Sequence, residues 1–274
     1  MKKIQVNDCH VNVKIQGAGE PMLFLHGVPD SSDVWTPAIE HFSPRYLCIA
    51  PDLPGFGETQ APKNFDYRLD NLARFVDSLL QNLSINEPVH LVVHDVGGIV
   101  GLAFAVRHPE KLKSLTIMDT VFFSDYKWHA MAKVWRKPWV GALTMHLMRH
   151  KQFSDAMKKA APSLSAQQIK NNYKHLTFAN RQLILKLYRT LDPEIFNGWQ
   201  EQLSSVTQQV PTQVIWGNKD TFLPVSLANR FATKKVHIIE PSGHWPMLEH
   251  PQRVHELIEG HIQTGISPKA GNEG

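Results

Sequence analysis

Cysteine is scarce in this chain of 274 residues, and long hydrophobic runs are missing. The two cysteines, Cys9 and Cys48, cannot build a disulfide framework, and they lack the spacing of a Cys/His metal site. No stretch approaches the roughly 18 apolar residues that a helix needs to span a bilayer. The basic N-terminal segment also lacks the apolar run of a signal peptide. We therefore expect a cytoplasmic protein with no bound metal and no other cofactor.

The composition excludes disordered and fibrous classes of protein. Hydrophobic residues make up 42% and charged residues 20% of the chain, which is typical of a globular protein with a large core. The sequence has no internal repeat, heptad pattern or low-complexity tract. Its length fits one large α/β domain that carries an insertion.

Positive charge is concentrated in the middle of the chain. Residues 126–190 contain thirteen Lys or Arg residues and one acidic residue, Asp155. The rest of the chain holds sixteen basic and twenty-four acidic residues. The middle segment thus has a net charge near +12 in a chain of net charge +4, which indicates a separate structural unit.

Short apolar runs that end in Gly, Pro or Asp are typical of buried parallel strands. Between two of these runs, residues 69–83 place their apolar side chains on one helical face. Residues 97–109 form a helix rich in small residues, suited to close packing on a sheet, and residues 251–262 form another helix. The predicted strands are 22–27, 46–52, 89–95, 112–119, 212–217 and 235–240.

The alternation of strands and helices stops after residue 120 and resumes near residue 206. Residues 1–120 and 206–263 are therefore predicted to form one α/β core, with residues 121–205 as an inserted helical lid. An insertion at this point lies above the carboxyl ends of the strands, where open α/β sheets bind ligands. Residues 264–274 are polar and Gly-rich, and we expect them to form a flexible tail.

The run LVVHDVGG joins a predicted strand to a glycine pair and a helix. This is the setting of a nucleophile elbow, in which a tight turn presents one side chain at a helix N-terminus. Asp95 occupies the tip, where serine is usual, and Gly97 and Gly98 permit the turn. The alternative role for Asp95 is that of a helix N-cap.

Two further loops carry residues that would complete a catalytic set. In WGNKD, Asp220 follows a predicted strand, and in PSGHW, His244 follows the next strand. Nucleophile, acid and histidine then occur in the chain order of a known hydrolase triad. This order predicts that Asp95, Asp220 and His244 act together. Asp119, which follows the strand before the lid, is the alternative acid.

The turn HGVP follows the first predicted parallel strand. Such a turn can aim a backbone N–H at the site, and with the amide that follows the elbow residue it would form an oxyanion hole. We expect the donors to be the backbone N–H groups of Val28 and Val96. The stretch DLPGFG, residues 52–57, is interpreted as a structural turn.

Together, the motifs HGVP, DLPGFG, HDVGG, WGNKD and SGHW resemble the α/β-hydrolase superfamily along nearly the whole chain. Aspartate at the elbow is similar to the branch that contains epoxide hydrolases and haloalkane dehalogenases. The resemblance implies that Asp95 attacks a carbon atom and forms an alkyl-enzyme ester, which water activated by His244 then hydrolyses while Asp220 orients the imidazole. Serine esterase and peptidase chemistry is not expected, because a carboxylate cannot form their acyl-enzyme.

Within this branch, the sequence favours epoxide hydrolysis, with dehalogenation of haloalkanes as the alternative. Dehalogenases typically hold the departing halide with a Trp after the nucleophile and an Asn or second Trp, but this chain has Val96 and Val28 at the corresponding positions. Epoxide hydrolases use two lid tyrosines as proton donors. Tyr188 resembles the lid Tyr-Arg motif that supplies one, and either Tyr126 or Tyr173 is expected to supply the other. Packing inside the lid is the alternative role of Tyr188.

Two functions of other classes stay open. A hydrolase fold can serve a non-catalytic binding protein, although the complete set of Asp95, Asp220 and His244 argues against this. The basic, Trp-rich lid is expected to be a solvated cap that attracts anionic substrates, and contact with a membrane surface is the alternative. No nucleic-acid-binding motif is present. The expected partner is a small apolar or amphipathic organic substrate.

Overall fold

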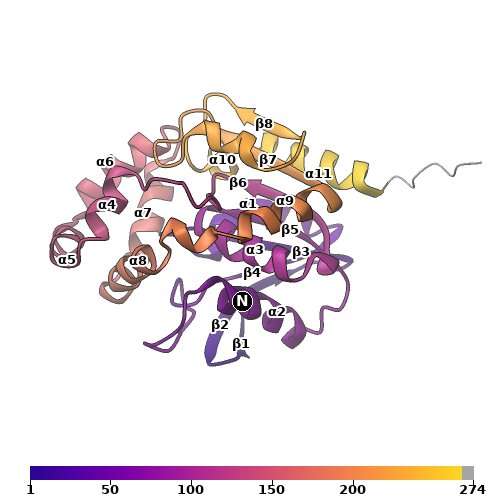
Figure 1. The fold of residues 1–274 in the computed structure, drawn as a ribbon, viewed down its shortest axis with the longest axis horizontal. Helices are drawn as coiled ribbons and strands as arrows, with labels where there is room; N and C mark the ends of the chain where they lie inside the picture. Colours follow the sequence, from indigo (N-terminus) through magenta and orange to yellow (C-terminus); the bar gives the residue numbers. More distant parts are fainter. Residues whose placement is uncertain (267–274) are drawn as a thin grey trace, which may run out of the picture.

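The computed structural model describes residues 1–266, and a single eight-stranded sheet with the strand order β1-β2-β4-β3-β5-β6-β7-β8 organises them (Figure 1). Every pairing from β4 through β8 is parallel, as the unbroken apolar runs predict. The six predicted strands are all confirmed. They are β3 (Glu20–Leu25), β4 (Tyr46–Pro51), β5 (Val89–His94), β6 (Leu112–Met118), β7 (Thr212–Gly217) and β8 (Val236–Ile239).

The sequence analysis missed two strands at the N-terminus, β1 (Lys2–Val6) and β2 (Cys9–Gln16). They form an antiparallel hairpin, and β2 also pairs antiparallel with β4. The turn between them contains Asn7 with a φ of 50°. Lys, Gln, Asn and His alternate with the apolar residues here because this edge of the sheet is partly exposed, so the segment lacks the continuous apolar run of the central strands.

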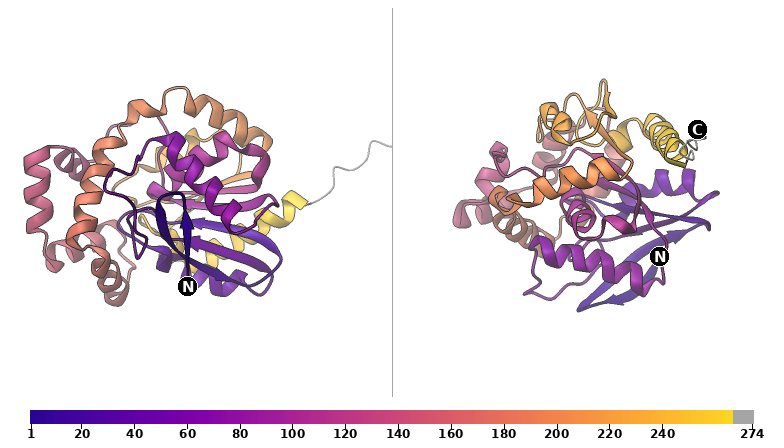
Figure 2. Two further views of the ribbon diagram at one scale, coloured as in Figure 1. Left: turned by 90° about the horizontal axis from the view of Figure 1, so that it is seen from below. Right: turned by 45° about the vertical axis from the view of Figure 1, so that its right-hand side comes forward.

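Helices cover both faces of the sheet, as expected for an α/β fold (Figure 2). On one face, α2 packs against α3, and α3 packs against α9; on the other face, α1 packs against α11. The predicted apolar stripe of α2 is buried, from Leu69 to Leu80. The bounds are α1 (Thr36–Phe42), α2 (Leu69–Asn82), α3 (Asp95–Arg107), α9 (Trp199–Gln209), α10 (Pro246–Glu249) and α11 (Pro251–Ile266).

Five helices between β6 and β7 gather at one end of the molecule, at the left of Figure 1. They lie in the segment predicted as the inserted lid, and they are α4 (Ala130–Trp135), α5 (Pro138–Leu147), α6 (His150–Ala160), α7 (Ala166–His175) and α8 (Phe178–Thr190). The predicted lid boundary at residue 205 falls inside α9, which packs against α3 of the core. The lid helices therefore end before α9, because the apolar side of that helix is buried against the core.

The C-terminal helix α11 extends to Ile266, so the first residues of the predicted flexible tail are helical. Residues 267–274, the rest of that predicted tail, lie outside the described residues. In the part of the chain that is described, none of the helices combines the length and the apolar character needed to cross a membrane.

Candidate active site

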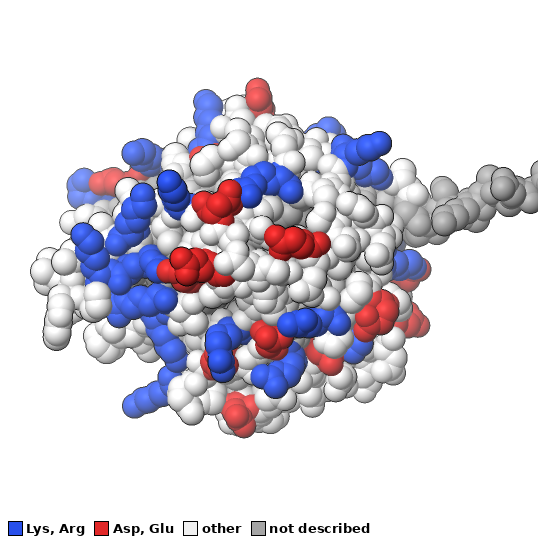
Figure 3. Space-filling model, viewed as in Figure 1, with Lys and Arg blue, Asp and Glu red and all other residues white. Residues whose placement is uncertain are grey.

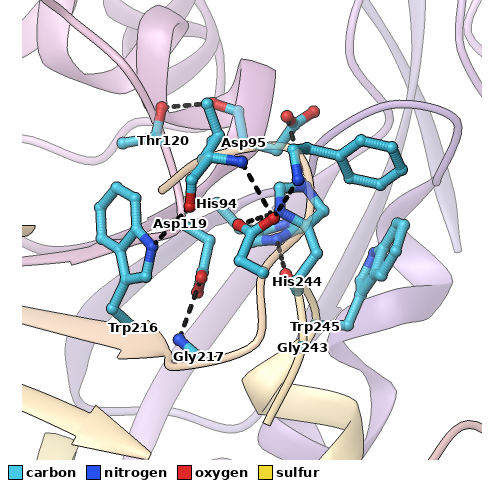
Figure 4. Close-up of polar contacts among 12 residues, drawn as sticks. His94, Asp95, Asp119, Thr120, Trp216, Gly217, Gly243, His244 and Trp245 are labelled. Carbon is cyan, nitrogen blue, oxygen red and sulfur yellow. Dashed lines mark hydrogen bonds and ion pairs between the residues drawn. The ribbon is translucent and has the colours of Figure 1, made fainter. Parts of the chain in front are cut away.

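Asp95 lies at the sharp turn between β5 and α3, with a φ of 50° in the left-handed region (Figure 4). This conformation is uncommon for a residue other than glycine, and it is the geometry of a nucleophile elbow. The Asp95 N–H donates to the carbonyl of Asp119 at 3.2 Å, and the Thr120 hydroxyl donates to the Asp95 carbonyl at 2.6 Å. These two hydrogen bonds fix the turn to the residues that follow β6.

Gly97 allows α3 to approach the sheet closely enough for this turn. A Cβ atom at this position would lie 2.4 Å from the carbonyl oxygens of Leu25 and His26, so a larger residue cannot be accommodated without moving the backbone. The N-cap of α3 is His94 and not Asp95. The Asp95 carboxylate instead accepts the Val28 N–H and lies 3.5 Å from Nε2 of His244. The N-cap alternative for Asp95 is therefore wrong.

His244 lies between two carboxylates. Its Nδ1 is 2.7 Å from Oδ2 of Asp220, and its Nε2 is 3.5 Å from Oδ2 of Asp95. Asp220 is held in turn, because its Oδ1 accepts backbone N–H groups from Phe222 at 2.7 Å and Leu223 at 3.0 Å. The structure therefore brings together the three residues predicted as a triad, in the order carboxylate, imidazole, carboxylate.

The electrostatics of the trio follow from burial and charge. Burial alone would raise the pKa of Asp95, but the hydrogen bond and charge of His244 lower that pKa to about 2. Burial disfavours the charged form of His244 and lowers its pKa. The neighbouring carboxylates of Asp220 and Asp95 raise the pKa of His244 by more, so it lies well above its ordinary value. At neutral pH the resting site thus holds an ionised Asp95 beside an imidazolium.

Asp119, the alternative acid, lies beside Asp220 and His244, with one ligand atom of each within 4.8 Å of the others. Its Oδ1 accepts the Gly217 N–H at 3.1 Å, and its buried Oδ2 has no hydrogen-bond partner among the described residues. Burial and the charge of Asp220 raise the pKa of Asp119 well above its ordinary value. Asp119 therefore favours its neutral form more than an ordinary aspartate does, and Asp220 is the group that contacts the imidazole.

The three groups could surround a cation by distance alone. However, a hydrogen bond already joins His244 Nδ1 to Asp220, and a metal ion would have to break it. The arrangement fits a hydrogen-bonded triad better than a metal centre.

The backbone of Val28 is aimed at the elbow, as predicted. Its N–H donates to Oδ1 of Asp95 at 2.8 Å. Val96 is the second residue of α3, and the first N–H groups of a helix have no partner within the helix. The Val28 amide therefore contacts the carboxyl group of Asp95 and can stabilise negative charge on its oxygens, whereas the same role for the Val96 amide stays a prediction.

The DLPGFG stretch has the structural role expected of it. The buried carboxylate of Asp52 accepts hydrogen bonds from the Ser32 N–H, the Asn12 side chain and the Glu58 N–H, at 2.7 to 2.9 Å. These bonds tie the loop after β4 to the loop that carries Val28. The stretch lies beside the site and supports its geometry.

A cavity lies between the elbow and the lid. Its walls are mostly apolar and include four methionines, whose flexible side chains adapt to different shapes of ligand. Asp95, His129, Tyr188 and His244 are the titratable side chains that line it. The methionines are Met131, Met145, Met148 and Met157.

The three lid tyrosines occupy different environments. Tyr188 lines the cavity and is buried, and burial together with the charge of Asp95 raises its pKa well above 10. The hydroxyl of Tyr126 donates to the carbonyl of Phe222 at 3.1 Å, and Tyr126 is not among the cavity-lining residues. Tyr173 packs against Phe153, with ring centroids 5.4 Å apart, and also lies outside the lining. The structure therefore brings only Tyr188 of the three to the cavity wall.

Two polar groups at the cavity were missed. Nδ1 of His129 accepts the Ala132 N–H at 3.3 Å, which places the proton of the neutral ring on Nε2, and burial lowers the pKa of His129 to about 4. Trp128 also lines the cavity, and its buried indole N–H has no partner among the described residues. No motif marks this Trp-His pair, because it reaches the site only through the folding of the lid.

Residues 20–251 match the family described as alpha/beta hydrolase fold, and this range makes up most of the chain. The chain therefore belongs to the α/β-hydrolase fold family, and its family and relatives support a hydrolase activity.

Three individual proteins illustrate the range of these similarities. Lipase 1 of Psychrobacter immobilis is 28% identical over 245 residues, which are 85% of this chain and 73% of the lipase. The cis-3-alkyl-4-alkyloxetan-2-one decarboxylase of Shewanella oneidensis is 36% identical over 110 residues, which are 39% of this chain and 35% of that enzyme. The structure of an epoxide hydrolase from Bacillus megaterium (M145A mutant) has a TM-score of 0.75 and 26% identity, and covers 96% of this chain and 100% of that one.

Proposed function

We propose that this protein is a hydrolase that uses Asp95 as a nucleophile toward carbon, and that its substrates are small apolar epoxides. The observation that carries the proposal is the ionised Asp95 carboxylate at the tip of an elbow, facing a largely apolar cavity, with His244 at 3.5 Å. A serine-type lipase mechanism is disfavoured, because the elbow has a carboxylate where an acyl-enzyme would need a hydroxyl.

In the first step, an oxygen of Asp95 attacks a ring carbon of the epoxide, and the carbon–oxygen bond of the ring breaks. The departing oxygen takes a proton from the Tyr188 phenol, leaving a hydroxyalkyl ester on Asp95. The high pKa of the buried phenol keeps it protonated until this moment. The apolar walls exclude water from the reacting carboxylate, which keeps its charge poorly solvated and reactive.

In the second step, His244 takes a proton from water, and the hydroxide attacks the carbonyl carbon of the Asp95 ester. The backbone N–H groups of Val28 and Val96 stabilise the oxyanion, and the intermediate collapses with release of the diol. Between the two steps, the His244 imidazolium gives up its proton, which restores the Tyr188 phenol and leaves a neutral imidazole to act on water. When the intermediate collapses, the leaving alkoxide takes the proton that Asp95 releases on ionising again, and His244 keeps the proton that it took from water. Water has then been added across the epoxide.

The order of these steps follows from the charges around His244. Two carboxylates hold the imidazole protonated in the resting site. Ester formation removes the charge of Asp95, so one of the two groups that raise the pKa of His244 is lost. The imidazole therefore becomes a better base only after the nucleophile has reacted.

Haloalkane hydrolysis is the second candidate, and the unpartnered indole N–H of Trp128 favours it. Trp128 and His129 both line the cavity, and their ring N–H groups are hydrogen-bond donors of the kind that a departing halide needs. These side chains offer hydrogen-bond donors to a halide, which the apolar side chains of Val28 and Val96 cannot do. Epoxides remain the first choice, because the Tyr188 phenol is a proton donor that halide release does not require.

Isotope labelling tests the nucleophile. We expect repeated turnover in water enriched in ¹⁸O to place the label in the side chain of Asp95, because hydroxide attacks the ester at its carbonyl carbon. Peptide mass spectrometry locates the label, and Asp220 in the same digest is the internal control that stays unlabelled. Label that enters only the product, with Asp95 unlabelled, would show that water attacks the substrate directly.

The Tyr188→Phe variant tests the substrate class. With an epoxide, we expect the rate of ester formation to fall by roughly 10²–10⁴-fold, the range for loss of a general acid, while hydrolysis of the ester changes little. Single-turnover kinetics separate the two steps. Tyr126→Phe is the matched control and should react normally, because that hydroxyl bonds to a backbone carbonyl. Unchanged ester formation in Tyr188→Phe would favour the haloalkane alternative.

A further inference from the structure

The outer face of α5 exposes a row of large apolar side chains. Trp139 is 89% exposed, and Val140, Leu143 and Leu147 are 49%, 59% and 54% exposed. Their spacing along the helix places Trp139, Leu143 and Leu147 on one side. All seven tryptophans lie in the described part of the chain, and Trp139 is the one whose side chain is mostly in water. Such a contiguous exposed patch marks an interaction surface.

The folding of the lid does not account for this patch. The opposite side of α5 carries the buried residues Gly141 and Met145, and this side packs on α4 and α8. A Cβ atom at Gly141 would lie 2.4 Å from the carbonyl oxygen of Trp135, which shows how closely the inner side is packed. The helix is therefore already fixed to the lid by its inner side, and its outer apolar side has no partner among the described residues.

Basic residues surround the patch. Lys133 and Lys137 lie before the start of α5, and Arg149 and Lys151 lie after its end. All four side chains are exposed. Figure 3 shows Lys and Arg gathered over the lid helices, with uncoloured atoms at the outer end where α5 lies. The single acidic residue of segment 126–190, Asp155, is paired with Lys151 at 2.9 Å. The surface is thus apolar at its centre and positive at its rim.

We propose that the outer face of α5 docks onto an anionic lipid surface, with Trp139 and Leu143 inserted at the interface and the surrounding lysines and arginines against the headgroups. Tryptophan favours the membrane–water interface, and basic residues gain binding energy near anionic lipid. A second copy of the chain fits this face less well, because a symmetric contact would bring two positive rims together.

The inner side of the same helix connects the docking face to the cavity. Met145 on α5 and Met148 directly after it line the cavity above Asp95. A lid that rests on lipid by its outer side would hold the cavity close to a reservoir of apolar molecules. The docking itself does not depend on which reaction Asp95 performs.

Vesicle co-sedimentation of the full chain tests the proposal. We expect binding to vesicles of equal parts phosphatidylcholine and phosphatidylglycerol, and much weaker binding to phosphatidylcholine alone. The Trp139→Ala/Leu143→Ala variant should bind at least about tenfold less, because it removes most of the inserted apolar area. Lys133→Gln/Lys137→Gln should lose about fivefold for each charge removed at low salt.

Matched controls carry the same kinds of change far from the lid. Ile238→Ala removes a 39% exposed apolar side chain on β8, and Lys2→Gln/Lys234→Gln removes two exposed charges; both should bind like the unmodified protein. Circular dichroism checks that each variant is folded. Failure of the unmodified protein to bind anionic vesicles, or equal binding by the Trp139→Ala/Leu143→Ala variant, overturns the proposal. Lipid-free dimerisation that this variant abolishes also overturns it, in favour of a contact between two copies.

Discussion

The His244→Gln variant is expected to consume one equivalent of substrate and then stop. The first step uses an oxygen of Asp95 as the nucleophile and needs no base, and the Val28 N–H that stabilises the ionised carboxylate is kept in this variant. The second step needs His244 to take a proton from water, and glutamine cannot do this. The ester should therefore accumulate on Asp95, with turnover reduced by at least about 10⁴-fold.

Intact-protein mass spectrometry measures this accumulation directly. Exposure of His244→Gln to panels of epoxides and haloalkanes should add the mass of one trapped group per chain, and that mass identifies the electrophile. An epoxide adds its full mass, whereas a haloalkane adds its mass without the halogen acid. His10→Gln, a change at an exposed histidine, is the control and should turn over normally. Absence of any adduct with either panel would contradict attack by Asp95 on these substrates.

The Asp220→Asn variant is expected to lose turnover by roughly 10⁴-fold, the loss seen when the orienting carboxylate of a triad is replaced by an amide. The 2.7 Å contact between Asp220 and Nδ1 of His244 fixes the tautomer and the direction of the ring. Asparagine keeps the shape of the side chain but loses the charge that holds the pKa of His244 high. The ester-hydrolysis step should be the one that slows.

Asp119→Asn is the matched control for this change. Because burial and the charge of Asp220 favour the neutral form of Asp119, we expect an amide of the same shape to change little, and its acceptor oxygen can keep the Gly217 hydrogen bond. We expect turnover within about tenfold of the unmodified enzyme. Steady-state and single-turnover rates compare the two variants. A larger loss in Asp119→Asn than in Asp220→Asn would show that Asp119 is the functional acid.

The sequence predicted those parts of the fold that depend on local patterns. All six predicted parallel strands formed, because a buried strand needs a continuous apolar run wherever it lies in the sheet. The elbow was also predictable, because only a strand, a tight turn and small residues such as Gly97 allow that approach of helix to sheet. The hairpin of β1 and β2 was missed, because an edge of the sheet that is partly exposed needs no such run.

The lid shows where local patterns stop being informative. Its basic composition and helical character were visible in the sequence, but the positions of its side chains were not. Of the tryptophans in the lid, Trp128 and Trp135 line the cavity, and Trp139 projects into solvent. Tyr188 reaches the cavity, while Tyr126 and Tyr173 are held elsewhere by a backbone carbonyl and an aromatic neighbour. Helical periodicity cannot distinguish these cases, because a lid helix has one side on the cavity, one on its neighbours and one in water.

The sequence by itself determined the α/β-hydrolase fold, the place of the insertion and the identity of Asp95, Asp220 and His244 as residues at strand ends. Parallel strands bring their carboxyl ends to one edge of the sheet, so residues far apart in the chain must meet there. Only the tertiary structure decided which acid touches His244, which tyrosine faces the cavity and which side of α5 is left exposed. Those outcomes depend on packing between distant segments, where a shift of a few ångströms exchanges one neighbour for another, and no local pattern encodes such a shift.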